Sequence, residues 1–173
     1  MPLTAILRNR SGITGCKHRF EHGSGGRNKE MDYYTSERIG RTFILKLVQG
    51  DCIRESIEKL VEKEQIRNAV IVSGIATLDR SRMHMISTTD HPMDVSIVGQ
   101  MDTPLEVASI DGLIVDGMVH IHMVTADKDR AYGGHVLERC RILYLGEIVI
   151  QELLGLDIVR REVEPGIFHI SER

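Results

Sequence analysis

Only one stretch of this chain spaces its apolar residues like a helix, and this constrains the fold more than any other feature. Four apolar residues recur at i, i+4, i+7 and i+8 and therefore form one stripe of an amphipathic helix: Ile53, Ile57, Leu60 and Val61. Asp51 comes just before them, and its carboxylate suits the N-cap position. The pattern predicts one principal helix over residues 51–64.

Apolar runs typical of strands lie on both sides of this helix. Residues 42–48 are rich in side chains that suit a pleated surface, and residues 69–75 form a short buried run that ends in Gly74-Ile75. A strand, a helix and a strand in such close succession predict a right-handed crossover and a parallel pair.

The rest of the chain favours strands alone. Seven strand-like runs follow, and they cover residues 82–87, 94–98, 105–110, 113–115, 119–124, 135–137 and 143–153. Turn signals separate them, including Asp111-Gly112 and Asp116-Gly117. We expect an α+β fold: a single domain with a mixed, mostly antiparallel β-sheet, packed by the one main helix and with a βαβ crossover near its start.

Length and composition fit one domain with an aliphatic core. The chain has 173 residues, of which 42% are hydrophobic but only 4% aromatic, and it has no Trp. A chain of this length is about one domain. Because aromatic residues are so scarce, Ile, Leu, Val and Met must fill the interior.

Charge divides the chain into unlike parts. Residues 1–30 hold 6 basic and 2 acidic groups, or +4, which leaves 16 basic and 23 acidic groups, or −7, for residues 31–173. Residues 1–36 lack hydrophobic periodicity, so we expect a basic, flexible leader there, with the domain over 37–163 and a tail over 164–173. A basic arm that touches nucleic acid is the alternative interpretation of the leader.

The cysteines indicate a reducing compartment. Cys16, Cys52 and Cys140 are odd in number and form no Cys-x-x-Cys pair, which argues against a disulfide framework and a zinc ribbon. No apolar run is long enough to span a membrane. We therefore expect a cytoplasmic protein that has no membrane contact.

Three histidines form the clearest candidate for chemistry. On a strand, His120 and His122 project to the same face, with attachment points roughly 6.6 Å apart. The polar turn after them can bring His135 onto the adjacent antiparallel strand, and Gly133 and Gly134 keep that neighbourhood uncrowded. The three imidazoles can then converge on one ion.

Three neutral ligands with an open fourth position are typical of catalytic zinc. We expect one divalent transition metal per chain, with zinc as the first choice, although imidazole also suits Ni, Cu, Fe and Co. The alternative is that these histidines are solvated or satisfied in the core. The remaining histidines lack such spacing and are interpreted as ordinary polar residues: His18, His22, His84, His91 and His169.

The order of these motifs resembles a known family. After the helix come Ser73-Gly74-Ile75, Leu105-Glu106, the His120-Ile121-His122 triplet and Gly133-Gly134-His135. Together they resemble the plants and prokaryotes conserved (PPC) domain over about residues 41–154. The resemblance implies a sheet flanked by a helix, a homotrimer, and a metal site at His120, His122 and His135. It also implies a role for Glu106 near that site, as a general base or as the holder of a metal-bound water.

The resemblance leaves several functions open. Plant relatives join this domain to an A·T-hook and act on DNA, whereas the fold is also similar to acetolactate decarboxylase, an enzyme with a three-histidine metal site. Here the A·T-hook is absent, and Thr103-Pro104-Leu105-Glu106 stands where the plant pattern has Gly-Arg-Phe-Glu.

The first hypothesis is a DNA-binding or regulatory protein, for which Arg80-Ser81-Arg82 and Arg139-Cys140-Arg141 are small candidate patches. The charge of −7 over residues 31–173 opposes it. The second is a metal-dependent enzyme of lyase or hydrolase type that acts on a small molecule. The third is a structural trimer in which the metal only holds strands together.

Overall fold

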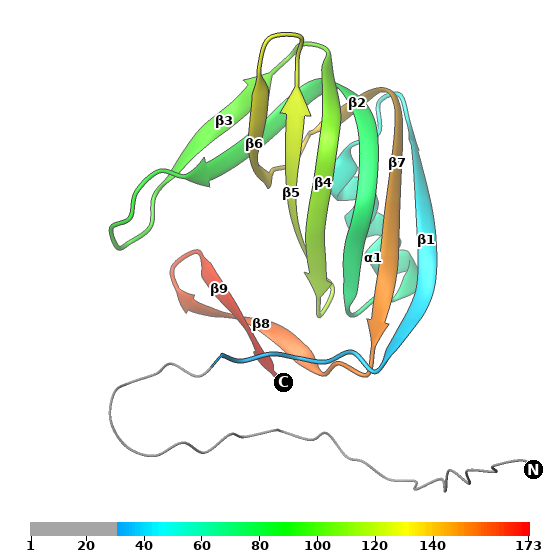
Figure 1. Cartoon of the computed structure of the whole chain (residues 1–173), viewed down its shortest axis with the longest axis vertical. Helices are drawn as coiled ribbons and strands as arrows, with labels where there is room; N and C mark the ends of the chain where they lie inside the picture. Colours follow the sequence, from blue (N-terminus) through cyan, green and yellow to red (C-terminus); the bar gives the residue numbers. More distant parts are fainter. Residues whose placement is uncertain (1–30) are drawn as a thin grey trace, which may run out of the picture. The chain divides into compact units, whose positions relative to one another are not determined.

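The computed structural model describes residues 31–173 of the chain (Figure 1). In chain order its elements are β1 (Arg38–Val48), α1 (Ile53–Glu64), β2 (Ala69–Ile86), β3 (Val95–Met101), β4 (Leu105–Val115), β5 (Met118–Ala126), β6 (Ala131–Val136), β7 (Arg141–Leu154), β8 (Ile158–Glu164) and β9 (Ile167–Glu172). The leader expected over residues 1–36 falls largely on residues 1–30, which lie outside the described part.

One sheet holds seven of these strands. Its order is β1-β7-β2-β4-β5-β6, and β3 pairs with the far half of β2. β6 also pairs with that half of β2, through Met83↔Val136 and His84↔His135. Because β2 pairs with both β4 and β6, the strands β2, β4, β5 and β6 form a closed ring. The ring brings together the three strands that carry His84, His120, His122 and His135, namely β2, β5 and β6.

The predicted parallel pair is wrong. β1 and β2 run in the same direction, but β7 lies between them and pairs antiparallel with both. Every pairing among the described strands is antiparallel, so the sheet is not mixed. Local patterns indicate that a helix joins two strands, but they carry no information on a later strand that inserts between the two.

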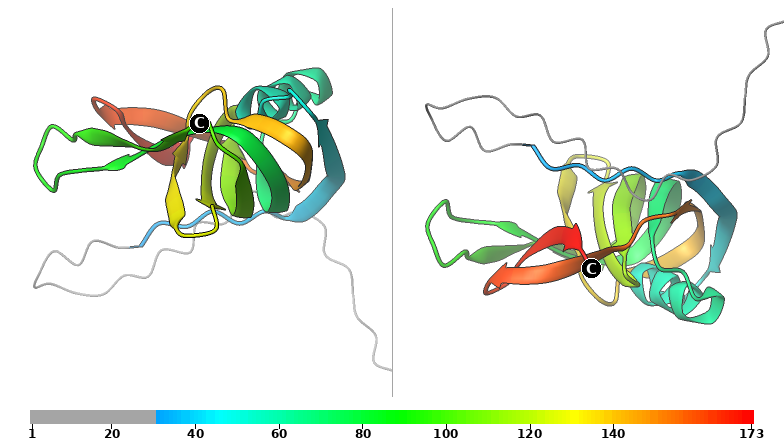
Figure 2. Two further views of the ribbon diagram at one scale, coloured as in Figure 1. Left: turned by 90° about the horizontal axis from the view of Figure 1, so that it is seen from above. Right: turned by 90° about the horizontal axis from the view of Figure 1, so that it is seen from below.

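The core lies between α1 and one face of the sheet (Figure 2). α1 buries the stripe Ile53, Ile57 and Val61, as its spacing predicts. The fully buried apolar side chains among the described residues are aliphatic or sulfur-containing, which confirms the expected aliphatic core.

The helix begins differently from the prediction. Its N-cap is Cys52, which makes no side-chain capping bond. The Asp51 carboxylate instead accepts a hydrogen bond from the backbone N–H of Val48 at 2.9 Å, and so closes the turn that leads out of β1. Asp51 is a turn residue rather than the cap of the helix.

Two strands are longer than predicted. β2 joins the runs 69–75 and 82–87, and β4 runs straight through Asp111-Gly112, where a turn was expected. Gly112 is needed for space, because a Cβ there would collide with the backbone carbonyl oxygen of His120 on β5. At Asp116-Gly117 the expected turn is present, with φ of 51° and 78°.

A hairpin of β8 and β9 follows the sheet, so the segment 164–173, expected as a tail, contains a strand. The hairpin is tied to the β4–β5 turn through Arg173, whose guanidinium bonds Asp116 and, at 3.2 Å, Asp157. Among the described residues, no helix has the length and the apolar character that crossing a bilayer requires.

Candidate metal centre

β5 presents His120 and His122 on one face. Along this strand Ile121 and Met123 are buried, whereas His120 is half-buried and His122 is exposed. The alternation is that of a strand with one face on the core, so the two imidazoles point away from it together. The spacing of the two histidines arises directly from the strand period.

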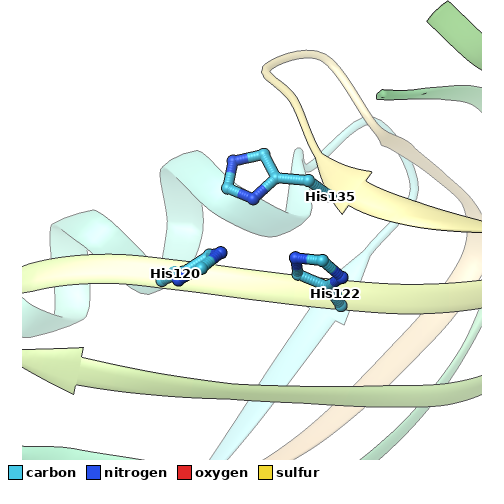
Figure 3. A group of neighbouring side chains, drawn as sticks. All are labelled: His120, His122 and His135. Carbon is cyan, nitrogen blue, oxygen red and sulfur yellow. The ribbon is translucent and has the colours of Figure 1, made fainter. Parts of the chain in front are cut away.

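β6 brings His135 to the same place. His135 is directly opposite His122 in the antiparallel register, and residues in such positions project to the same side of a sheet. Figure 3 shows the three imidazoles turned toward a common space, two from β5 and one from β6. The structure thus brings together the three histidines that the sequence singled out.

The arrangement fits a single ion. One ring nitrogen from each of the three lies within 4.8 Å of the others. Tetrahedral binding at about 2.0–2.1 Å from each nitrogen separates the nitrogens by about 3.4 Å. Modest rotations of the imidazoles cover the difference. The ring centroids are 5.2 Å apart for His120 and His122, 4.8 Å for His120 and His135, and 5.4 Å for His122 and His135.

A fourth histidine that the sequence did not single out joins them. His84 on β2 is paired opposite His135, and the two rings stack at 4.7 Å with an angle of 19° between their planes. His84, interpreted from the sequence as an ordinary polar residue, thus lies against a candidate metal ligand, although it is not one of the three whose ring nitrogens converge. No sequence signal identified it, because its neighbourhood depends on the closing contact between β2 and β6.

The surroundings of His84, His120 and His135 favour the neutral form of these three imidazoles. Burial, followed by the neighbouring histidines, lowers the pKa of His135 from its ordinary value of 6.5 to about 4. Burial also lowers the pKa of His120, and the next largest cause is the positive charge of Arg160 on β8. Burial lowers the pKa of His84 as well. Neutral imidazoles are the form that binds a metal.

Glycine allows the close approach of β6 and β2. A Cβ on Gly134 would lie 2.6 Å from the backbone carbonyl oxygen of His84, a distance that real contacts do not reach. Gly133 is different, since its nearest neighbour would be Val124 at 3.6 Å. Of the two glycines expected to keep the site uncrowded, Gly134 has this role.

Glu106 does not lie among the histidines. It is opposite Ala126, four residues along β5 from His122, or roughly 13 Å at the rise of a strand. The carboxylate closest to the cluster by register is Asp111, directly opposite His122 on β4. Asp111 also accepts a hydrogen bond from Ser109 Oγ at 2.8 Å. Sequence reasoning took Asp111 for a turn residue.

The other histidines lie elsewhere or outside the described residues. His91 Nδ1 is 2.9 Å from Glu164 Oε2 on the surface. His169 is on β9, opposite Arg161, whereas His18 and His22 fall outside the described part of the chain. Of the cysteines, burial raises the pKa of the Cys140 thiol to about 11 and also raises that of Cys52. Neither thiol is ready to bind a metal.

Comparison with known proteins identifies one family and several solved structures with the same fold. The family model of the Plants and Prokaryotes Conserved (PCC) domain matches residues 34–154. No curated protein matches the chain. The solved structures described below share the fold and are less than 25% identical to this chain.

Three of them illustrate the likeness. A metal-containing protein of Archaeoglobus fulgidus has a TM-score of 0.69 and 23% identity, over 82% of this chain and 100% of that one. A plant- and prokaryote-conserved (PPC) protein of Pyrococcus horikoshii has a TM-score of 0.69 and 24% identity, over 83% and 99%. A protein of Bacteroides thetaiotaomicron, provisionally described as DNA-binding, has a TM-score of 0.63 and 18% identity, over 80% and 96%.

Proposed function

Because this chain belongs to the Plants and Prokaryotes Conserved (PCC) domain family, we propose that it functions through one divalent transition metal held by His120, His122 and His135. The convergence of the three ring nitrogens carries this proposal. The A. fulgidus protein of the same fold is described as metal-containing, which supports it. Zinc is the proposed metal, since three imidazoles with an open position are its usual catalytic ligand set.

The proposed task is to bind and activate a small molecule, in a reaction of lyase or hydrolase type. When bound, such a metal supplies Lewis acidity toward a carbonyl group or a water. The chain supplies three neutral ligands, which leave the positive charge of the metal uncompensated. His120 and His135 are half-buried, whereas His122 is exposed and leaves one side of the site accessible.

Two carboxylates are candidates for moving a proton. Asp111 is opposite His122 and is the better placed of the two, while Glu106, the residue expected from the family resemblance, lies further along β4. If either acts as a general base, its amide variant keeps the metal but loses turnover. Comparing Asp111→Asn with Glu106→Gln assigns the role.

A substrate screen tests the enzymatic task. Small carbonyl and carboxylate compounds are incubated with the metal-loaded protein, the chelated protein and His122→Ala. Turnover that requires both metal and His122 is the expected result. A folded, metal-loaded protein that converts none of them favours the remaining hypothesis, in which the metal only joins β5 to β6.

DNA binding is the second candidate, because three arginines of the expected basic patches line one cavity of about 340 Å³: Arg80, Arg82 and Arg139. Proteins of the same fold from B. thetaiotaomicron and Ralstonia eutropha are provisionally described as DNA-binding. However, Asp102 lies 2.5 Å from Arg80 and offsets its charge.

Fluorescence anisotropy with labelled duplex DNA separates this candidate from the first. Binding through phosphates weakens steeply as salt increases, and it falls in Arg82→Gln and Arg139→Gln but not in the triple His→Ala variant. Absence of binding at low salt removes this candidate.

Assembly into a homotrimer is also proposed. Exposed apolar side chains on β1, β7 and β2 support it, and Ile44 is 77% and Ile75 56% exposed. Such a patch marks an interaction surface. Sedimentation equilibrium of the native protein and of Ile44→Glu tests it: three chains are expected for the first and one for the second, whereas a monomeric native protein contradicts the proposal.

The proposed limits of the domain are residues 37–163, between the basic leader and the C-terminal segment. The proposed location is the cytoplasm, where the free thiols of Cys52 and Cys140 would remain reduced.

A further inference from the structure

The cavity of about 340 Å³ brings together three arginines from two separate parts of the chain. Arg80 and Arg82 come from β2, and Arg139 comes from the turn between β6 and β7. Asp102, from the turn between β3 and β4, is the one acidic residue in the lining. The charges of these four side chains sum to 3 − 1 = +2. Sites for small molecules usually have about 300–1,000 Å³, so the cavity is large enough for one.

β2 turns Arg80 and Arg82 to the same face. Ser81 and Met83 beside them are fully buried, whereas both arginines are partly exposed. This is the alternation of a strand with one face on the core. The Asp102 carboxylate is 2.5 Å from Arg80 Nε. The pair orients the guanidinium of Arg80 at the cavity and offsets its charge.

Backbone contacts fix the turn that carries Arg139 against β2. The carbonyl oxygen of Arg82 accepts a hydrogen bond from Leu137 N–H at 3.0 Å, and the N–H of Arg82 donates to Cys140 Sγ at 3.2 Å. Between them, Arg139 donates its own N–H to Glu55 Oε1 at 2.8 Å. Its φ is 70°, in the left-handed region that glycine adopts without strain. The turn itself therefore does not explain an arginine here, and strain of this kind is common at ligand-binding positions.

Two of the three guanidinium groups have no partner within residues 31–173. Arg82 and Arg139 make their hydrogen bonds through backbone atoms alone, and neither forms an ion pair. Arg82 is partly exposed and Arg139 is exposed, so a ligand from solution can reach both. Their charges are uncompensated, and the cavity is therefore suited to an anion.

The charge and the donors of the cavity match a phosphate monoester. A guanidinium presents a planar pair of N–H donors, which bind two oxygens of one phosphate side by side. A phosphate monoester carries a charge of about −1.5 to −2 at pH 7, close in size to the charge of the cavity, whereas a carboxylate or a phosphodiester carries a single negative charge. The −7 of residues 31–173 disfavours a long polyanion such as DNA, whose phosphates extend beyond the cavity.

We propose that this cavity binds the phosphate monoester group of a small molecule. Arg82 and Arg139 are its main donors, and Arg80 contributes from the position that Asp102 gives it. None of the three converging histidines lines this cavity. The proposal thus adds a second ligand site and goes beyond the metal-dependent function.

Isothermal titration calorimetry of the full-length protein at low salt tests the proposal, with glycerol phosphate and inorganic phosphate as probes. Saturable binding at one site per chain is expected. Arg82→Gln and Arg139→Gln are each expected to lower the affinity for glycerol phosphate roughly tenfold or more, the loss typical of a hydrogen bond to a charged group. Arg82→Lys keeps the charge but not the planar pair of donors, and an intermediate affinity is expected. A native protein that binds neither probe would overturn the proposal.

Arg130→Gln is the matched control. Arg130 is exposed on the turn between β5 and β6, does not line the cavity and, like Arg139, donates a hydrogen bond through its backbone N–H. The substitution removes the same charge from a comparable position, so unchanged affinity for glycerol phosphate is expected. Equal weakening in Arg130→Gln and Arg139→Gln would show a general charge effect and overturn the site. Circular dichroism establishes that each variant is folded.

Two further arms separate this site from the metal centre and from DNA binding. The titration is repeated in chelator, where unchanged affinity for glycerol phosphate is expected. Loss of binding in the folded, chelated protein would place the phosphate on the metal and overturn the proposal. Duplex DNA at an equal concentration of phosphate is expected to compete weakly. Full displacement of glycerol phosphate by the duplex would assign the three arginines to DNA instead. A native protein without metal would contradict the proposed function but leave the expected phosphate binding unchanged.

Discussion

A fourth histidine beside the three can be either a further metal ligand or a stacking partner of His135, and the geometry of His84 favours the second role. The rings lie 4.7 Å apart and nearly parallel, whereas the three mutually close ring nitrogens belong to the other histidines. His84→Phe keeps a flat ring against His135, so near-native metal affinity is expected. His84→Ala removes the ring and is expected to lower the metal affinity roughly tenfold, the usual effect of losing a residue that contacts a metal ligand. Equal losses in both variants would instead make His84 a ligand.

Gly134 is needed because β6 and β2 approach closely. In Gly134→Ala the new methyl group meets the His84 carbonyl oxygen at 2.6 Å, and backbone cannot move away cheaply. We expect a loss of about 1–3 kcal/mol in the free energy of unfolding, the usual cost of overpacking. Gly133→Ala is the control, since its nearest contact is an ordinary 3.6 Å. Equal melting temperatures for Gly134→Ala and Gly133→Ala would contradict this prediction.

The histidines predict how acid affects the metal-free protein. His135 has a pKa of about 4 when folded against an ordinary 6.5, so between these pH values the unfolded chain binds more protons than the folded one. Stability is therefore expected to fall as the pH falls from 6.5 to 4. In chelator, His135→Gln should lose less stability over this range than the native protein. Parallel curves of melting temperature against pH would contradict the prediction.

The sequence predicts those residues of the site whose positions follow from the two-residue period of a strand. His120 and His122 share a face because two residues separate equivalent positions on a strand. A hairpin then brings His135 to them. His84 and Asp111 could not be found in this way, because their proximity to the three histidines depends on the register of distant strands.

At the scale of elements, the hairpin of β8 and β9 is held to the sheet by polar contacts at the β4–β5 turn. Asp116 bonds both Arg67, at 3.4 Å, and Arg173, and all three side chains are partly exposed. Asp116→Asn keeps a residue that tolerates the positive φ but removes the charge. Because such pairs contribute little each, a change of less than about 1 kcal/mol in global stability is expected.

The local effect should be larger than the global one. In Asp116→Asn, amide hydrogen exchange over residues 158–172 is expected to accelerate while that of β2 and β7 stays native. Asp129→Asn is the control, because its pair with Lys128 is on the far turn between β5 and β6. Unchanged exchange in the hairpin would mean that its apolar contacts, through Ile158 and Val159, suffice.

The sequence predicts the kinds of element better than their limits. Helical spacing of apolar residues indicates α1, and apolar runs indicate most strands of the sheet, but these runs divide β2 and β4 into shorter strands. Glycine is common in turns, so Gly112 suggested one. The structure shows instead that Gly112 leaves room for the backbone carbonyl of His120 on β5. The hairpin of β8 and β9 was not predicted, because residues 158–172 are rich in charge and, beyond Ile158 and Val159, mostly exposed.

At the scale of the whole molecule, β7 decides the topology. It pairs with β1 on one side and β2 on the other, which converts a predicted parallel pair into an antiparallel sheet. β6 then closes the ring on β2. Both contacts join residues far apart in the chain, and no local pattern encodes them. The closed ring is what holds histidines from three strands together.

Elemental mass spectrometry of the untagged protein shows whether the protein holds a metal through its three histidines. We expect about one transition metal per chain in the native protein and a similar content in His91→Ala, whose histidine is on the surface beside Glu164. In His122→Ala we expect the metal to be lost. Circular dichroism shows whether each variant is folded. No metal in the folded native protein, or equal metal in His122→Ala, would contradict the account.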